Sequence, residues 1–272
     1  MNLSGNVLEG GNLPVQARLR RGWLASLTKA ADVPQKLLAL CVVYIAGAAL
    51  VWPSTYFVMV QIYLLKLAVL GSLSFVAVMI PAAVIISPKG PVRFVVTSIR
   101  SNGLRASFVV TMFMLSLAAF TTYKVNIPNI IPFYCDEALA DLGELLHSQA
   151  PWRLVHAFDS DILAMAVSAT YSVIWFFEWF GLVFLAALSA NQLVHLRYLT
   201  ALALVTLVVG TVLATLFSSV GPIFYDEFLG GERYAELLEV LKQRPYNEHV
   251  LSYSNYLLTA YKADRTALGS GI

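Results

Sequence analysis

The sequence predicts an all-α, polytopic integral membrane helix bundle with about five transmembrane helices and amphipathic helices on its outer face. Three observations lead to this fold class. Of the 272 residues, 58% are hydrophobic and only 12% are charged; the mean hydropathy is +0.72; and the apolar residues form uncharged runs of about twenty, the length that crosses a bilayer. Soluble domains contain about 25% charged residues. The composition therefore excludes a soluble enzyme, a disordered chain and a disulfide-stapled secreted domain.

Four long apolar stretches, at residues 37–86, 106–122, 162–188 and 198–217, predict the membrane spans. The first has 50 residues with Lys66 as its only charge, which is more than one bilayer crossing uses. The polar segment Pro53-Ser54-Thr55, followed by Gln61, divides it, so we expect helices over residues 37–57 and 63–86. Each of the other three stretches predicts one helix, which makes five spans.

The distribution of lysine and arginine sets the expected orientation. With five spans, residues 1–36, 87–105 and 189–197 share one side and carry ten Lys and Arg against two acidic residues. Residues 123–161 and 218–272 carry seven against thirteen. We therefore expect a basic cytoplasmic tail over residues 1–36, a cytoplasmic N-terminus and an external C-terminus. Because topology and lipid headgroups explain the basic residues, no nucleic-acid partner is expected.

Three segments on the predicted outer side have apolar residues at helical spacing. They begin at Asp136-Glu137, after Gly230-Gly231, and at Val250. The acidic pair favours a helix N-terminus electrostatically, and tyrosines on the later segments are typical of a membrane interface. Two interpretations are open: these helices pack over loop ends, or they cover a site that faces the outer leaflet.

Two charged residues fall within the apolar stretches. Glu178 lies near the middle of the fourth predicted span, where a carboxylate is costly and is expected to face the bundle interior. We expect it to pair with Lys66 or to stay protonated among hydroxyls; Lys66 alternatively extends toward a membrane surface. Gly210, Ala214 and Ser218 are spaced four apart, which favours close helix packing.

Few residues on the outer side are candidates for a binding site. Arg153 and His156 are spaced i,i+3, so one helical face presents two groups that can hold a phosphate, although they equally suit anchoring to lipid headgroups or to acidic outer loops. Asp226 either lines a headgroup pocket or begins a helix. His195 and His249 are expected to be solvated. Cys41 and Cys135 fall on opposite sides of the membrane, and no cysteine or histidine cluster has zinc-like spacing, so neither a metal nor a cofactor is predicted.

Two segments carry a resemblance to a known family: Pro151-Trp152-Arg153-Leu154-Val155-His156-Ala157-Phe158, followed by a span with Tyr171 and Trp175, and Ser218-Ser219-Val220-Gly221-Pro222-Ile223-Phe224-Tyr225-Asp226. Together they resemble bacterial members of the inositolphosphotransferase branch, akin to inositol phosphorylceramide synthases, of the type 2 phosphatidic acid phosphatase superfamily. The resemblance covers residues 127–272; residues 37–126, the first three spans, match only in hydropathy. It implies a bundle of about six helices in the bacterial inner (plasma) membrane.

In that family a histidine attacks a lipid phosphate ester to form a phosphohistidine, and a second histidine, oriented by an aspartate, handles the proton. These histidines lie after the Gly-Pro-aromatic segment, the first in a Pro-Ser-(Met/Leu)-His motif. The chain has neither motif, so no catalytic residue is carried over. Residues 267–272 resemble the lead-in to the first motif, and we expect a chain truncated one helix short of the active site.

These observations leave three functions open. The first is a lipid phosphotransferase or phosphatase fold that lacks its catalytic histidines and binds a membrane lipid or phospholipid headgroup. The second is a non-catalytic lipid-binding or scaffold protein. The third, a transporter, rests on Glu178 and Lys66 alone, without a repeat or a broken helix pair.

Overall fold

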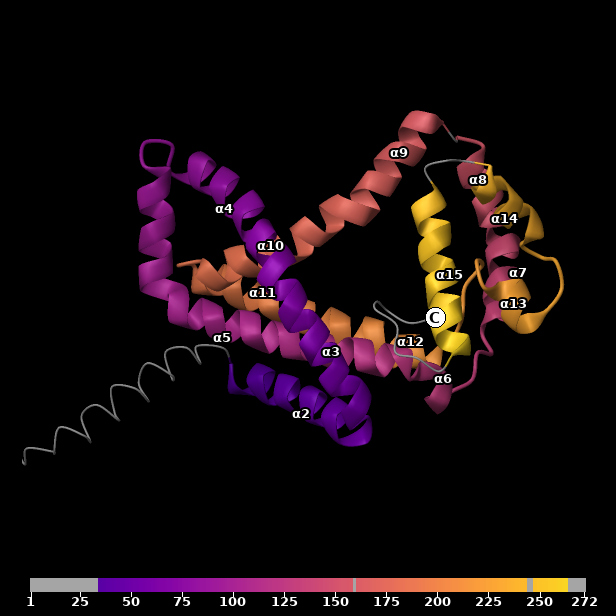
Figure 1. The fold of residues 1–272 in the computed structure, drawn as a ribbon, viewed down its shortest axis with the longest axis horizontal. Coiled ribbons are helices and arrows are strands. Elements are labelled where there is room, and N and C mark those ends of the chain that lie inside the picture. Colours follow the sequence, from indigo (N-terminus) through magenta and orange to yellow (C-terminus); the bar gives the residue numbers. More distant parts are fainter. Residues whose placement is uncertain (1–33, 159, 244–246, 264–272) are drawn as a thin grey trace, which may run out of the picture.

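The computed structural model of the chain describes residues 34–158, 160–243 and 247–263, and within these residues all regular structure is helical (Figure 1). This confirms the all-α prediction. Most of the predicted basic tail, residues 1–33, and the lead-in at residues 267–272 lie outside the described residues.

The first apolar stretch forms two helices, as predicted, but the break lies at Trp52. Helix α2 covers Gln35–Val51, and α3 (Pro53–Lys66), a π-helical segment η1 (Leu67–Gly71) and α4 (Ser72–Ile86) continue as one long helix. Trp52 has φ −130° and ψ 65°, outside the helical region, and Pro53 occupies the first helical turn, a position where its missing N–H costs nothing. The predicted boundary at residues 58–62 was wrong because Gln61 is tolerated within the helix.

The third span is much longer than predicted. Helix α5 covers Pro91–Val125, 35 residues, so the expected loop over residues 87–105 is reduced to residues 87–90. Figure 1 shows that α5 bends in its first half. The prediction of a loop was wrong because the arginines there mark a membrane surface, which does not require the helix to end.

The fourth and fifth predicted spans are also continuous helices with π-helical segments. Helix α9 (Asp161–Ala169), η2 (Thr170–Ile174) and α10 (Trp175–Leu188) form one, and α11 (Gln192–Leu204), η3 (Val205–Leu213) and α12 (Ala214–Leu216) form the other. Asn191 caps α11 by accepting hydrogen bonds from the N–H groups of Leu193 and Val194.

The described residues contain three helices long and apolar enough to cross a membrane: Pro53–Ile86, Pro91–Val125 and Gln192–Leu216. Two shorter apolar helices, Gln35–Val51 and Phe177–Leu188, fall within the other two predicted spans. By their length and composition, these three candidate spans suggest a multi-pass membrane protein.

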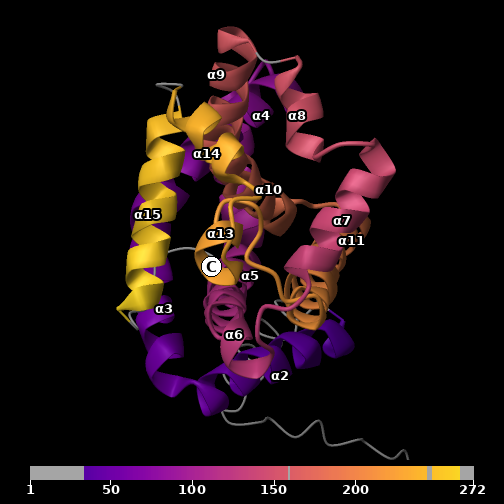
Figure 2. The same ribbon diagram turned by 90° about the vertical axis from the view of Figure 1, so that its right-hand side faces the viewer.

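The remaining helices gather at one end of the bundle. They are α6 (Ile127–Ile130), α7 (Asp136–His147), α8 (Pro151–His156), α13 (Tyr225–Leu229), α14 (Ala235–Lys242) and α15 (Glu248–Lys262). Figures 1 and 2 place α7, α8, α13, α14 and α15 together, on the right in Figure 1, whereas the start of α2 and the turns at 87–90 and 189–191 lie at the other end. We call these five helices the cap. The two polar segments predicted to share a side therefore do lie at one end.

Close contacts hold the bundle together. The buried hydroxyls of Tyr63 on α3 and Thr121 on α5 are hydrogen-bonded at 2.7 Å. A side chain at Gly181 would overlap Val78 of α4, and a Cβ at Gly210 would lie 2.7 Å from the ring of Phe120. Small residues thus allow these helices to approach closely, and the packing role predicted for Gly210 is confirmed.

Side chains of α5 also donate hydrogen bonds to the backbone carbonyls at the end of α10. Arg105 donates from Nε to the Ala187 carbonyl at 3.3 Å and from Nη2 to the Ser189 carbonyl, and Asn102 donates to the Leu188 carbonyl at 3.2 Å. The last carbonyls of a helix have no partner within it, and a cation there also suits the helix dipole. Arg105 and Asn102 therefore fix the α10–α11 turn against α5.

We predict that Arg105→Gln destabilises the bundle by about 1–3 kcal/mol, because hydrogen bonds from a charged donor are lost at partly buried carbonyls. Thermal unfolding of the purified protein in detergent, followed by circular dichroism, measures this as a lower midpoint. Arg100→Gln, an exposed arginine on the same helix, serves as the matched control and should leave the midpoint unchanged. Equal midpoints for the two variants would contradict the role of Arg105.

Candidate functional site

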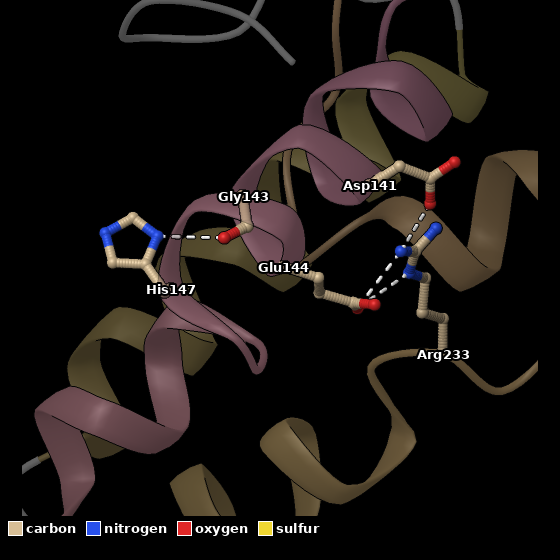
Figure 3. A network of polar contacts seen from close by, with 5 residues as sticks. All are labelled: Asp141, Gly143, Glu144, His147 and Arg233. Atoms are coloured by element: carbon tan, nitrogen blue, oxygen red, sulfur yellow. Dashed lines mark hydrogen bonds and ion pairs between the residues drawn. The ribbon is translucent and has the colours of Figure 1, made fainter.

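Arg233, which precedes α14, connects this part of the cap to α7 through two ion pairs (Figure 3). Its Nη2 lies 2.6 Å from Oδ1 of Asp141 and 3.0 Å from Oε1 of Glu144, and its guanidinium lies over the Tyr225 ring, 5.8 Å from the centroid. The hydrogen bond with Asp141 raises the pKa of Arg233 further above its ordinary value. His147, also in Figure 3, donates from Nδ1 to the Gly143 carbonyl at 2.8 Å, within α7.

A second link is the carboxylate of Asp136, the first residue of α7, which is only 3% exposed. Its Oδ1 accepts from the Ser219 hydroxyl at 2.7 Å and from the Gly221 N–H at 2.9 Å, and its Oδ2 accepts from the Val220 N–H at 3.0 Å. Gly221 has a φ of +78°, a conformation that glycine adopts readily. The segment at residues 218–226 thus folds around a carboxylate of the same chain.

A small apolar core lies beneath these links. The buried members are Ala140 of α7, Tyr225 of α13, and Tyr234 and Leu237 of the α14 region, with Trp152 and Leu241 packed against them. Burial raises the pKa of the Tyr234 hydroxyl above its ordinary value. Because these residues come from four segments, the apolar core packs these parts of the cap against one another.

The structure places both Arg153 and His156 on α8, beside Trp152. The Arg153 guanidinium lies 5.2 Å from the centroid of the Trp152 ring, and the His156 ring meets the same ring edge-on at 5.4 Å. Arg153 forms an ion pair with Glu236 in the first turn of α14, which is the predicted alternative of an acidic outer partner. Nδ1 of His156 is buried and has no hydrogen-bond partner among the described residues.

Asp226 lies on α13 and binds the start of α14. Its Oδ2 accepts from the Tyr234 N–H at 3.0 Å, while its Oδ1 is buried without a hydrogen-bond partner in the described part of the chain. Arg153 and Asp226 thus both contact the N-terminal end of α14, one through Glu236 and one through the backbone. No contact among the described residues joins Asp226 directly to Arg153 or His156.

Large apolar side chains are exposed on α8 and on the segments that precede and follow it in the sequence. Val155, Phe158 and Ile162 are 65%, 79% and 83% exposed, and Leu145 at the end of α7 is 78% exposed. An exposed apolar group of this kind beside a cation and a tryptophan is typical of a segment that enters the membrane interface. This part of the cap therefore has the composition of a headgroup-level surface.

Within the spans, Glu178 and Lys66 do not form the predicted ion pair. The ammonium of Lys66 lies over the ring of Tyr63, on its own helix, 5.3 Å from the centroid. The Glu178 side chain is exposed on α10, which corrects the expectation that it faces the bundle interior, and it lies near Tyr198 of α11. The helices bearing Glu178 and Lys66 do pack together, but these two side chains take different neighbours.

Two other expectations about single residues have clear outcomes. His195 is wrong as a solvated residue: it is 0% exposed, and its Nδ1 hydrogen-bonds the Ala186 carbonyl at 2.7 Å, because the turn at 189–191 folds α11 back onto the end of α10. Cys41 and Cys135 are free thiols. The described residues contain no group of three or more metal-ligating side chains. The side chain of His249 lies outside the described residues.

Sequence reasoning missed Arg233 and the role of Asp136 in the cap. The acidic pair at residues 136–137 was explained as a helix start, and the Ser-Ser-Val-Gly run at residues 218–221 was not connected with it. The signal that could have found this contact is the run of small residues at 218–221, because successive backbone N–H groups in such a run can bind a carboxylate.

Comparison of the chain with protein-family models, with curated proteins and with solved structures finds no match.

We predict that Asp136→Asn loosens the cap by about 1–3 kcal/mol, because an amide replaces one accepting oxygen and leaves a buried donor unsatisfied. Limited proteolysis of the cap segments in detergent measures the change as faster cleavage. Glu137→Gln, the exposed neighbour on the same helix, is the matched control and should be cleaved at the wild-type rate. An Asp136→Asn protein as resistant as wild type would refute the role of this carboxylate.

Arg233→Gln should detach α14 from α7, because Asp141 and Glu144 both lose their cation and Tyr225 loses its stacking partner. We expect a loss of about 1–2 kcal/mol, the range of a networked and partly buried pair rather than of an exposed one. Hydrogen exchange of α7 and α14 measures this as reduced protection. Lys242→Gln, which removes only a local i,i+3 pair with Glu239, should leave protection unchanged; the same loss in both variants would contradict the assignment.

Proposed function

We propose that the chain is a multi-pass membrane protein whose cap binds the phosphate-bearing headgroup of a membrane lipid, on a scaffold like that of the inositolphosphotransferase branch of the type 2 phosphatidic acid phosphatase superfamily. The observation that carries the proposal is the composition of α8: Arg153 and His156 flank one tryptophan, within a surface of exposed apolar side chains. In the proposed orientation this end faces outside and the N-terminus lies in the cytoplasm.

The ion pair between Arg153 and Glu236 supports an anionic ligand. A guanidinium that holds one carboxylate at an exposed position can exchange it for a phosphate, whose oxygens match the same fork of N–H donors. His156 adds a second nitrogen on the same helix turn. Glu236 then acts as an internal competitor that occupies Arg153 until a headgroup arrives.

A lipid is favoured over a free phosphate because the surrounding side chains are apolar. Phe158 and Ile162 are largely exposed beside α8 and suit contact with acyl chains below a headgroup. The proposal for these residues is binding without turnover, because none of the four histidines of the chain lies in the motif that the phosphohistidine chemistry of the resembled branch requires.

Binding of short-chain phosphatidic acid to the purified protein in detergent, measured by isothermal titration calorimetry, tests the proposal. We expect Arg153→Gln to weaken binding about tenfold, the effect of one lost charge-assisted hydrogen bond, and Glu236→Gln to strengthen it by releasing the arginine. Lys242→Gln, another exposed cation of the cap, is the control and should bind as wild type does. Wild-type affinity in Arg153→Gln would overturn the proposal, and tighter binding of inorganic phosphate than of phosphatidic acid would overturn the choice of a lipid.

A further inference from the structure

A cavity of about 100 Å³ lies among α2, α5, α10, α11 and η3, away from the cap and within the apolar helices. Its wall is mostly apolar and includes Leu37, Phe113, Trp179, Ala203 and Leu207. A wall of this composition favours apolar groups over water. Its ligand must therefore present hydrocarbon to it.

Three of the four polar side chains that line the cavity, those of Cys41, Tyr44 and Ser116, have partners within the protein. Cys41 hydrogen-bonds Ser116 on α5, and the hydroxyls of Tyr44 and Thr211 are 2.7 Å apart. Since these groups are satisfied by each other, they do not require a polar ligand. They also tie α2 to α5 and to η3 on two sides of the cavity, so the cavity is bounded by hydrogen-bonded helices.

The π-helical segment η3 forms one side of the cavity. It covers Val205–Leu213, nine residues, and the Thr211 hydroxyl donates to the Thr206 carbonyl five residues earlier, at 3.1 Å. Such wide turns are rare and frequently occur at functional sites. Val205 and Val209 of η3 are more than half exposed, as is Val43 on α2, so the surface beside the cavity is one that only bilayer hydrocarbon suits.

Two cations are close in sequence to residues that line the end of the cavity remote from the cap. Lys36 adjoins Leu37 on α2, and Arg197 lies two residues before Leu199 on α11; both leucines line the cavity. Both cations are exposed, and neither makes an ion pair with a described residue. Of the helices that line the cavity, α2, α5 and α11 contain no acidic residue, and α10 contains one, Glu178, which makes no ion pair with either cation.

From this arrangement we propose that the cavity is a binding site for one anionic phospholipid of the leaflet at this end. One acyl chain fills the cavity against Trp179 and Ala203, and the headgroup phosphate lies between Lys36 and Arg197. Charge complementarity selects the anionic lipid, and the apolar wall selects its chain. The site is separate from the cap and does not depend on the function proposed for the cap.

Trp179 gives a direct test, because bromine atoms on an acyl chain quench a tryptophan that they touch. The full chain with Trp179 as its only tryptophan, the other four being changed to phenylalanine, is reconstituted in phosphatidylcholine vesicles. These contain a low fraction of phosphatidylglycerol or of phosphatidylcholine, brominated in the acyl chains. We expect brominated phosphatidylglycerol to quench more strongly, with an enrichment of about fivefold for each of the two cations. Equal quenching by the two lipids would overturn the proposal without reference to any further variant.

Two pairs of variants separate the chain from the headgroup. Ala203→Phe fills the cavity and should reduce quenching by phosphatidylglycerol to the phosphatidylcholine level, whereas Ala201→Phe, exposed on the same helix, should not. Lys36→Gln with Arg197→Gln should abolish the preference for phosphatidylglycerol, whereas Lys89→Gln, an exposed cation at the same end, should retain it. A preference that survives either test variant unchanged would refute the site. Arg153→Gln in the cap should leave quenching unaffected, so failure of one proposal is distinguishable from failure of the other.

Discussion

The buried carboxylate of Asp136 is the interaction on which the arrangement of the cap depends. Two backbone N–H groups and one hydroxyl from residues 219–221 donate hydrogen bonds to it. In the sequence, the two long helices from α9 to α12 separate these donors from Asp136. A negative charge removed from water is stable only when its oxygens are hydrogen-bonded. The start of α7 is therefore fixed relative to the end of α12, and Arg233, Glu236 and Asp226 act on segments that are already in place.

At the opposite end of the bundle, a cation, Arg105, satisfies partly buried backbone groups in the way that the Asp136 carboxylate does in the cap. There the carbonyls at the end of α10 are free, and Arg105 and Asn102 of α5 satisfy them. A backbone group without a partner is most costly near hydrocarbon, so these two side chains stabilise the turn between α10 and α11. Thus Asp136 fixes the polar segments at one end of the bundle, and Arg105 fixes a turn at the other end. Few charged residues are needed for these contacts in a chain that is only 12% charged.

Local patterns in the sequence predicted the kind of structure and much of its order. The polar segment at residues 53–55 correctly indicated that the first apolar stretch forms two helices, although the predicted break at residues 58–62 was wrong. The spacing of apolar residues after Asp136 correctly indicated an amphipathic helix. Helix ends were less predictable, because the arginines near residue 100 indicate water or headgroups and are compatible with a continuing helix. Of the site, the i,i+3 relation of Arg153 and His156 was readable on one helix, but the partner of Arg153 lies 83 residues away. The burial of His195 was not predicted for the same reason. Its hydrogen-bond partner is a carbonyl on the preceding helix, and the residues next to His195 in the sequence do not indicate that contact.

The polar links of the cap also fix an order of events in biogenesis. Arg233 and Asp141 are 92 residues apart, and Asp136 and Gly221 are 85 apart, with the helical hairpin from α9 to α12 synthesised between them. When the first polar segment leaves the ribosome, its acidic residues have no partners, and they acquire them only after both helices of the hairpin have been inserted and the second segment has reached the same side. Formation of the cap therefore requires both polar segments and a hairpin between them that brings their ends together.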